Sequence, residues 1–229
     1  MKNVFLVLAS MAAFAMSFSS CGNHKSVPQV EQMEQMEEDS MPCCPPTDFR
    51  LSLIRLNDFP LAKAEATACE LNRRLGAICF AEVYVEDTVR QIPASCIYKP
   101  RNRYWAGKIL DMLKVNDTNW VRIGLTDRDI STSVHGHYNY GIMGLSLRPG
   151  SACVVSTFRL KRSKDLWKVV AHEFLHSRGL PHCRKDNPKC IMQDAHGKDT
   201  YYMKNDLCGD CRKHLQEILG YDPTMGGHH

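Results

Sequence analysis

The chain has 229 residues, of which 44% are hydrophobic and 24% are charged, and its formal net charge is +4. This composition excludes a fibrous or wholly disordered protein, and the length allows one ordinary globular domain with a substantial core. The basic residues are scattered and form no run or RNA-binding motif, so we expect no nucleic-acid partner.

The first 21 residues are predicted to be a targeting segment. An apolar run from Val4 to Phe18 follows a short, positively charged N-terminus and is too short to span a membrane as a helix. The junction Ser19-Ser20-Cys21 resembles a bacterial lipobox, which implies cleavage before Cys21 and lipidation of that residue. An ordinary secretory peptide that is cut elsewhere is the alternative. We therefore expect a lipoprotein of the bacterial cell envelope, anchored to a membrane through Cys21 on a periplasmic or surface face.

A polar tether is predicted over residues 22–47. Its acidic stretch from Glu31 to Asp39 contains no aromatic residue, and three prolines follow, so it is too polar to bury a core. The folded domain is then expected over residues 48–222, and residues 223–229 are expected to be a disordered tail.

The folded domain is predicted to be of mixed α/β type. Alternation of apolar and polar residues predicts a strand over Phe49–Leu56, and the signals Asp58, Pro60 and Gly76 bound a helix whose apolar face carries Leu61, Ala64, Ala68, Leu71 and Leu75. The other predicted elements are strands over 78–85 and 120–125, a helix over 102–115, a hairpin of strands 138–147 and 152–160, and a last helix over 206–219. Strand 120–125 is almost wholly apolar and is therefore expected to be central in a sheet.

The segment from His172 to Cys183 reads HExxHxxGxxHC. Two histidines four residues apart lie on one face of a helix, so both can reach one metal ion. Apolar residues at helical spacing support that helix, and Ser163 or Asp165 is its expected cap. Gly179 can take the left-handed conformation that ends a helix, which lets His182 approach the same metal. Three neutral nitrogens with one open position are typical of catalytic zinc, and incidental histidines on an amphipathic helix are the alternative.

Four cysteines follow this motif in two pairs, Cys183 with Cys190 and Cys208 with Cys211, and Met192 forms a Cys-x-Met pattern with Cys190. Four thiolates fit a closed tetrahedral zinc site, whereas two disulfides are the alternative in an oxidising compartment. The six cysteines that remain besides Cys21 permit three disulfides: Cys43, Cys44, Cys69, Cys79, Cys96 and Cys153.

The succession HExxHxxGxxHC, Cys-x-Met and CxxC resembles the archaemetzincin (archaelysin) family of zinc metallopeptidases in the metzincin clan, over roughly residues 48–222. The resemblance implies a zincin-type twisted sheet with an active-site helix and a C-terminal zinc-bound subdomain. It implies two zinc ions, a general base at Glu173 and a methionine, Met192, under the catalytic zinc. The implied ligands are His172, His176 and His182 for the catalytic ion, and Cys183, Cys190, Cys208 and Cys211 for the structural ion. The interval between Cys183 and Cys190 is two residues longer than the family pattern.

The expected function is hydrolysis of peptide bonds in a peptide or protein substrate by a zinc-activated water, with the protein acting as a monomer. The substrate is expected to lie as an added strand along the edge strand 138–147. The candidate hydrogen-bond donors to the oxyanion are Tyr138, Tyr140, Tyr201 and Tyr202. Two histidines, His135 and His137, lie either at the rim of the cleft, where they contact substrate, or on a surface loop without a functional role. Two alternatives are a zinc-bearing surface lipoprotein that binds a partner without cleaving it and a zinc hydrolase of non-peptide amides or esters. The carboxylate of Glu173 argues against the first, because a binder has no need of it.

Overall fold

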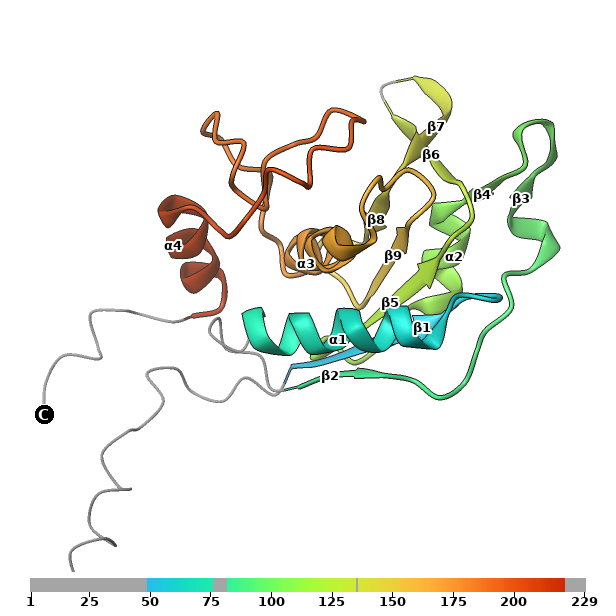
Figure 1. The fold of residues 1–229 in the computed structure, drawn as a ribbon, viewed down its shortest axis with the longest axis horizontal. Coiled ribbons are helices and arrows are strands. Elements are labelled where there is room, and N and C mark those ends of the chain that lie inside the picture. Colours follow the sequence, from blue (N-terminus) through green and yellow to red (C-terminus); the bar gives the residue numbers. More distant parts are fainter. Residues whose placement is uncertain (1–48, 76–81, 135, 221–229) are drawn as a thin grey trace, which may run out of the picture. The chain divides into compact units, whose positions relative to one another are not determined.

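The computed structural model describes residues 49–75, 82–134 and 136–220 (Figure 1). The predicted signal segment, the tether up to residue 47 and the tail from 223 lie outside these ranges, as do Cys43, Cys44 and Cys79. Every helix within the described ranges is too short or too polar to cross a bilayer.

A five-stranded sheet forms the centre of the folded unit. Its strands are β1 (Arg50–Arg55), β2 (Glu82–Val85), β5 (Trp120–Thr126), β8 (Gly144–Ser146) and β9 (Ala152–Ser156), in the order β2-β1-β5-β9-β8. The first four strands in this order are parallel, and β8 runs antiparallel to β9 at the edge. The prediction of an apolar central strand is confirmed by β5, which has sheet neighbours on both sides.

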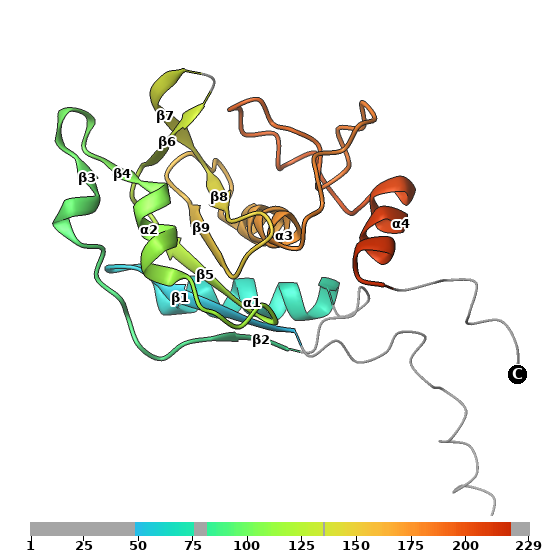
Figure 2. The same ribbon diagram turned by 180° about the vertical axis from the view of Figure 1, so that it is seen from behind.

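Helices cover both faces of this sheet. Helices α1 (Leu61–Leu75) and α3 (Leu166–Ser177) lie on one face and α2 (Ala106–Leu113) on the other (Figures 1 and 2). Side chains that alternate along β1 point to opposite faces of the sheet and are buried under different helices. Leu51 and Leu53 belong to the core under α1 and α3, whereas Ile54 belongs to the core under α2. The sheet is therefore buried on both faces.

A second sheet, which the sequence did not predict, contains β3 (Ile97–Tyr98), β4 (Arg103–Trp105), β6 (Ile130–Val134) and β7 (His137–Ile142). Its strand order is β3-β4-β6-β7. The buried carboxylate of Asp129, just before β6, binds it to the rest of the unit, because Asp129 accepts hydrogen bonds from Arg103 at 2.6 Å and from Arg159 at 2.9 Å. Two charge-assisted partners compensate the burial of this carboxylate.

The second sheet explains two wrong predictions. The helix predicted from Asn102 begins only at Ala106, because the preceding residues form β4 and pair with β3 and β6. The strand predicted over 138–147 is two strands, of which β7 belongs to the second sheet and only β8 pairs with β9. The hairpin around Arg148-Pro149-Gly150 is confirmed for β8 and β9.

The helices agree with the sequence more closely than the strands do. Helix α1 is confirmed, although Leu61 is 44% exposed and does not join the buried face. Asp165 makes no capping hydrogen bond to α3, because its carboxylate pairs with Arg162 and Lys168 instead. The last helix, α4, covers Gly209–Ile218 and so begins three residues later than predicted.

Candidate metal and catalytic site

Helix α3 carries the first two histidines of the motif through the interior. Every residue of α3 is buried, because the helix packs on the sheet with one side and under the 183–207 segment with the other. The helix ends before Gly179, whose φ of +98° lies in the left-handed region, as predicted. The chain then turns back and brings His182 against the rings of His172 and His176, at 5.3 and 4.6 Å between ring centroids.

Hydrogen bonds define the tautomers of the two helical histidines. Nδ1 of His172 lies 2.8 Å from the Ile191 carbonyl oxygen, and Nδ1 of His176 lies 2.7 Å from that of Leu180. Because a carbonyl oxygen only accepts, both Nδ1 atoms carry the proton. Burial lowers the pKa of His172 well below its usual value and that of His176 to about 3, so both rings are neutral. Their Nε2 atoms therefore present lone pairs.

These two lone pairs face one another, so a cation between them would be coordinated by both. The two Nε2 atoms are 3.1 Å apart, and neither has a proton to donate. A tetrahedral zinc ion with bonds of about 2.0–2.1 Å separates its nitrogen ligands by about 3.3 Å. The ligand nitrogens of His172, His176 and His182 all lie within 4.8 Å of one another. Nδ1 of His182 lies 3.6 Å from Asp194, a carboxylate that is placed to orient the third ring. The donor set and its spacing thus fit zinc.

Glu173 lies beside this cluster with its carboxylate buried. The residue is 5% exposed, and its Oε2 atom has no hydrogen-bond partner among the described residues. Burial raises the pKa of Glu173 to about 7, and the charge of Arg148 opposes that rise. Gly144 of β8 approaches the side chain so closely that an added Cβ would lie 2.5 Å from its Cγ. The edge strand of the sheet therefore runs directly against the carboxylate.

A cleft of about 600 Å³ opens over the histidines and Glu173, between β7 and β8 on one side and the 194–201 segment on the other. Of the tyrosines proposed as oxyanion donors, Tyr140 and Tyr201 line this cleft. Tyr138 packs against Trp105 and Tyr202 against Arg162, away from it. His137 also lines the cleft, whereas His135 lies outside the described residues.

The cleft contains two charged residues that the sequence analysis missed, Arg148 and Asp194. No spacing relative to the HExxH motif marks either residue. Arg148 was assigned only to the turn of a hairpin, although the short β8 strand places it at the end of the cleft edge. A charged residue two positions after a short edge strand is the only sequence signal for Arg148, and it is a weak one.

The four downstream cysteines form a second cluster. Their Sγ atoms all lie within 4.8 Å of one another, and those of Cys183 and Cys208 are 3.7 Å apart. A tetrahedral zinc ion with bonds of about 2.3 Å separates its sulfur ligands by about 3.8 Å, whereas a disulfide requires about 2.05 Å. All four thiols are free, as are Cys69, Cys96 and Cys153, so none of the disulfides that the sequence permits forms among the described cysteines. The longer interval between Cys183 and Cys190 does not prevent the four from meeting.

One short segment belongs to both clusters. His182 and Cys183 are neighbours in the chain, and the Cys183 amide donates a hydrogen bond of 2.8 Å to the Met192 carbonyl. The residue before Met192 is Ile191, whose carbonyl accepts from His172. The histidine cluster and the cysteine cluster are thus connected through the backbone around Met192, a residue with no exposed surface.

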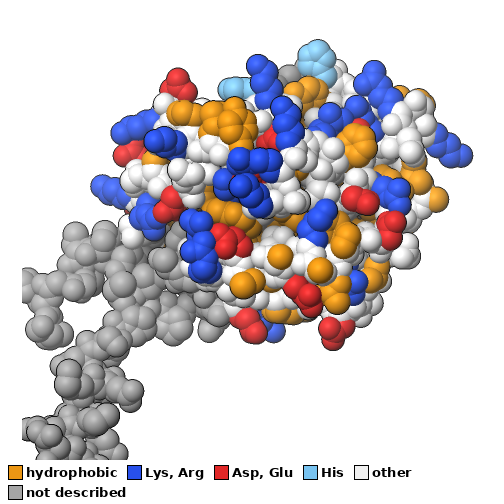
Figure 3. Space-filling model, viewed as in Figure 1, with side chains coloured by type: hydrophobic (Ala, Val, Ile, Leu, Met, Phe, Trp, Pro, Cys, Tyr) orange, Lys and Arg blue, Asp and Glu red, His pale blue; other side chains and the backbone are white. Residues whose placement is uncertain are grey.

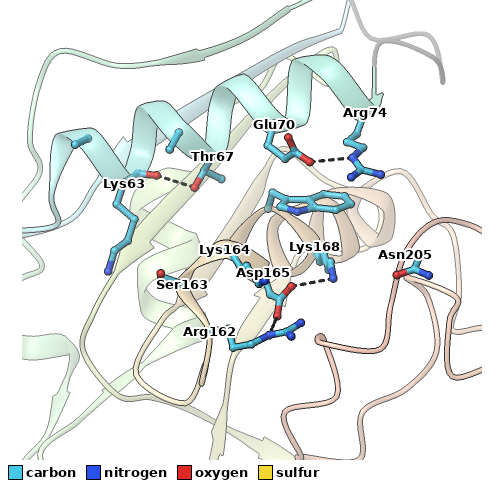
Figure 4. Close-up of a pocket in the computed structure, with 13 residues that line it drawn as sticks. Lys63, Thr67, Glu70, Arg74, Arg162, Ser163, Lys164, Asp165, Lys168 and Asn205 are labelled. Atoms are coloured by element: carbon cyan, nitrogen blue, oxygen red, sulfur yellow. Dashed lines mark hydrogen bonds and ion pairs between the residues drawn. The ribbon is translucent and has the colours of Figure 1, made fainter.

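A second hollow, of about 980 Å³, lies between α1 and the start of α3 (Figure 4). It contains the ion pairs of Asp165 with Arg162 and Lys168 and of Glu70 with Arg74. None of the described residues that line it is a histidine or a cysteine, so these residues offer no soft metal ligand. On the face that Figure 3 shows, basic side chains are spread out with acidic and apolar side chains between them.

Several known proteins are similar to this chain in sequence or fold. No protein-family model matches the chain. The archaemetzincin of Haloquadratum walsbyi is 27% identical over 182 residues, which cover 72% of this chain and 98% of that protein. The archaemetzincin of Nanoarchaeum equitans is 30% identical over 125 residues, covering 54% of this chain and 69% of that protein. The crystal structure of a zinc-dependent peptidase from Methanocorpusculum labreanum has the same fold, with a TM-score of 0.59 and 24% identity over 72% of this chain and 99% of that one.

A mixed sheet with an antiparallel edge strand, a buried helix that carries HExxH and a third histidine after a left-handed glycine together define a zinc metallopeptidase. Its three-histidine cluster and its four-cysteine cluster are consistent with two zinc sites. The chain belongs to the archaemetzincin family.

Proposed function

We propose that this metallopeptidase cleaves peptide bonds at the zinc held by His172, His176 and His182, with Glu173 as the general base. The observation that carries the proposal is the buried carboxylate of Glu173, whose Oε2 atom has no partner among the described residues and which lines the same cleft as His172 and His182. When bound there, zinc supplies Lewis acidity toward the substrate carbonyl and brings the pKa of a water close to neutrality. The second zinc, on Cys183, Cys190, Cys208 and Cys211, has a structural role.

Residues around the zinc site transfer the proton and stabilise the oxyanion. Glu173 accepts a proton from the attacking water at its free carboxylate oxygen and delivers it to the leaving amine. The hydroxyls of Tyr140 and Tyr201, which line the cleft, are the donors available to the oxyanion. Burial raises the pKa of Tyr201 well above its usual value, so that hydroxyl stays protonated and able to donate.

The substrate backbone pairs with the edge strand. In the five-stranded sheet, β8 is the last strand on its side, and Gly144 at its start lies against Glu173. An extended peptide that adds to this edge presents its carbonyls to the cleft at the level of the carboxylate. This arrangement supports a peptide or protein substrate more directly than a small ester or amide, which has no strand to pair.

Glu173→Gln tests the general base, because the amide keeps the shape of the side chain and cannot take a proton. Zinc content and hydrolysis of a diverse peptide library are measured side by side, with and without chelator. We expect wild-type zinc content and loss of hydrolysis in the variant. A variant with full activity would contradict the mechanism, and a wild-type protein whose products do not depend on zinc would contradict the site.

The proposed location of the enzyme is the bacterial cell envelope, where a lipid anchor at Cys21 holds it to a membrane. The enzyme is proposed to be a monomer. Its support is the apolar run followed by Ser19-Ser20-Cys21 in the sequence. Intact-mass measurement of the native protein tests it, because lipidation at Cys21 leaves a defined N-terminus that Cys21→Ala abolishes. An unmodified N-terminus at another residue would reject the anchor without affecting the catalytic proposal.

A further inference from the structure

Lys204 is a buried lysine beneath the candidate catalytic site. It has no exposed surface and lies on the segment between Met192 and Cys208. Its ammonium group donates hydrogen bonds to the carbonyls of Ile191, at 3.0 Å, and of Gln193. These two carbonyls stand on either side of Met192, so the ammonium group binds both ends of that turn.

Burial of the Lys204 ammonium group costs free energy of folding. Removing an ammonium group from water is unfavourable unless the protein compensates it. Among the described residues, its polar partners at short range are the two carbonyls, and its Nζ atom lies 4.5 Å from the ring centre of Tyr201. Cys190, Asp194 and Glu173 stabilise its charge from a longer distance. The ammonium therefore lies where Cys190 of the cysteine cluster, and Asp194 and Glu173 beside the histidine cluster, all act on it.

The Ile191 carbonyl joins Lys204 to the first histidine of the motif. That oxygen accepts from Lys204 and also from Nδ1 of His172, at 2.8 Å. A carbonyl oxygen has two lone pairs, so it accommodates both donors at once. The partner of a metal-binding histidine determines its tautomer and its ring orientation. Whatever holds this carbonyl in place therefore also aims Nε2 of His172.

The other contacts that hold the turn are made by the backbone and by the Cys190 thiol, to which the Met192 amide donates. The Met192 carbonyl accepts from the Cys183 amide at 2.8 Å, and the Ile191 amide donates to the Asp206 carbonyl at 2.9 Å. Of the hydrogen bonds described for the 191–193 backbone, those from Lys204 and His172 come from side chains. Lys204 is thus the contact of this turn that a substitution can remove without removing a ligand.

We propose that Lys204 is a positioning residue, which holds the turn at Ile191–Gln193 and thereby orients His172 for the catalytic zinc. This inference rests on the proposed function of the three-histidine site. It assigns no contact with substrate to Lys204. Loss of the ammonium group should loosen the acceptor of His172 while leaving the four cysteines in place.

The test compares Lys204→Met with Lys204→Arg and with a matched control, Lys168→Met. Lys168 is also buried, at 8% exposed, and its ammonium donates to a backbone carbonyl, that of Tyr201, and pairs with Asp165. Cobalt(II) is used as the probe, because both sites show visible ligand-field bands but only the four-cysteine site adds sulfur-to-cobalt charge transfer in the near ultraviolet, which reports that site separately. Metal affinity at each site, both spectra, kcat and the thermal unfolding temperature are measured for all variants.

For Lys204→Met we expect at least a tenfold loss of metal affinity at the three-histidine site, altered ligand-field bands, lower kcat and an unchanged charge-transfer band. Lys204→Arg should recover most of the affinity, and Lys168→Met should keep both spectra even where it unfolds at a lower temperature. Wild-type affinity and bands in Lys204→Met would overturn the proposal. Equal losses in Lys168→Met would also overturn it. So would failure of both Lys204→Met and Lys204→Arg to fold, since the role of Lys204 would then be structural. A wild-type protein that binds no cobalt through histidine would instead refute the proposed function.

Discussion

Replacement of Gly144 by alanine tests the close approach between the edge strand and Glu173. An added Cβ would lie 2.5 Å from Cγ and 2.6 Å from Oε1 of Glu173, whereas ordinary contact begins near 3.4 Å. The carboxylate must therefore move by about 1 Å, a misplacement that costs about a hundredfold in rate. A hundredfold loss corresponds to about 2.7 kcal/mol of activation free energy. We expect kcat/KM for a cleaved peptide to fall by about this factor.

The assay separates misplacement of Glu173 from damage to the fold or to the metal site. Zinc content should stay at the wild-type value, because the atoms nearest to the added Cβ belong to Glu173 and not to a histidine. Gly107→Ala is the matched control, since no atom lies within 4 Å of an added Cβ at that exposed position of α2, and it should leave kcat/KM unchanged. Wild-type kcat/KM in Gly144→Ala, with zinc content equal in both proteins, would refute the argument that this glycine makes room for the carboxylate.

Two further predictions concern the cysteine cluster and acid stability. Cys208→Ser combined with Cys211→Ser should lose both metals in a mild chelator in which wild type keeps two, because the loop around His182 would then be ordered only when catalytic zinc binds. Ordering one or two residues at about 1–2 kcal/mol each lowers the affinity by roughly ten- to a thousandfold. One tightly held zinc with normal activity would show that the sites are independent. Hydrogen bonds from Arg73 and, to a lesser extent, Arg74 lower the pKa of Glu70 from 4.5 to about 2, so these contacts contribute stability above pH 4.5 that is lost as the pH falls toward 2. Glu70→Gln should therefore flatten the dependence of the unfolding free energy on pH in that window, measured by urea titration, and an unchanged slope would contradict the assignment.

The local sequence was enough to predict the three-histidine cluster, because the geometry that brings these side chains together is local. His172 and His176 meet since residues four apart share one face of a helix, and Gly179 turns the chain because its backbone tolerates the φ of +98° that the structure has. The apolar residues predicted β1, α1 and the central β5 for a similar reason, since burial on one face leaves a periodic pattern and burial on both faces leaves a nearly continuous apolar run.

Only the tertiary structure decided how the site is completed. The second sheet, with β4 where a helix was predicted, is made of short strands that carry little periodic signal, and its two hairpins meet only through the pairing of β4 with β6 across α2 and β5. The same is true of Gly144 against Glu173, Asp194 beside His182 and the hydrogen bonds from Lys204 to the carbonyls around Met192. A backbone carbonyl has no identity in the sequence, so a contact that uses one becomes visible only when the folded chain brings its partner to it.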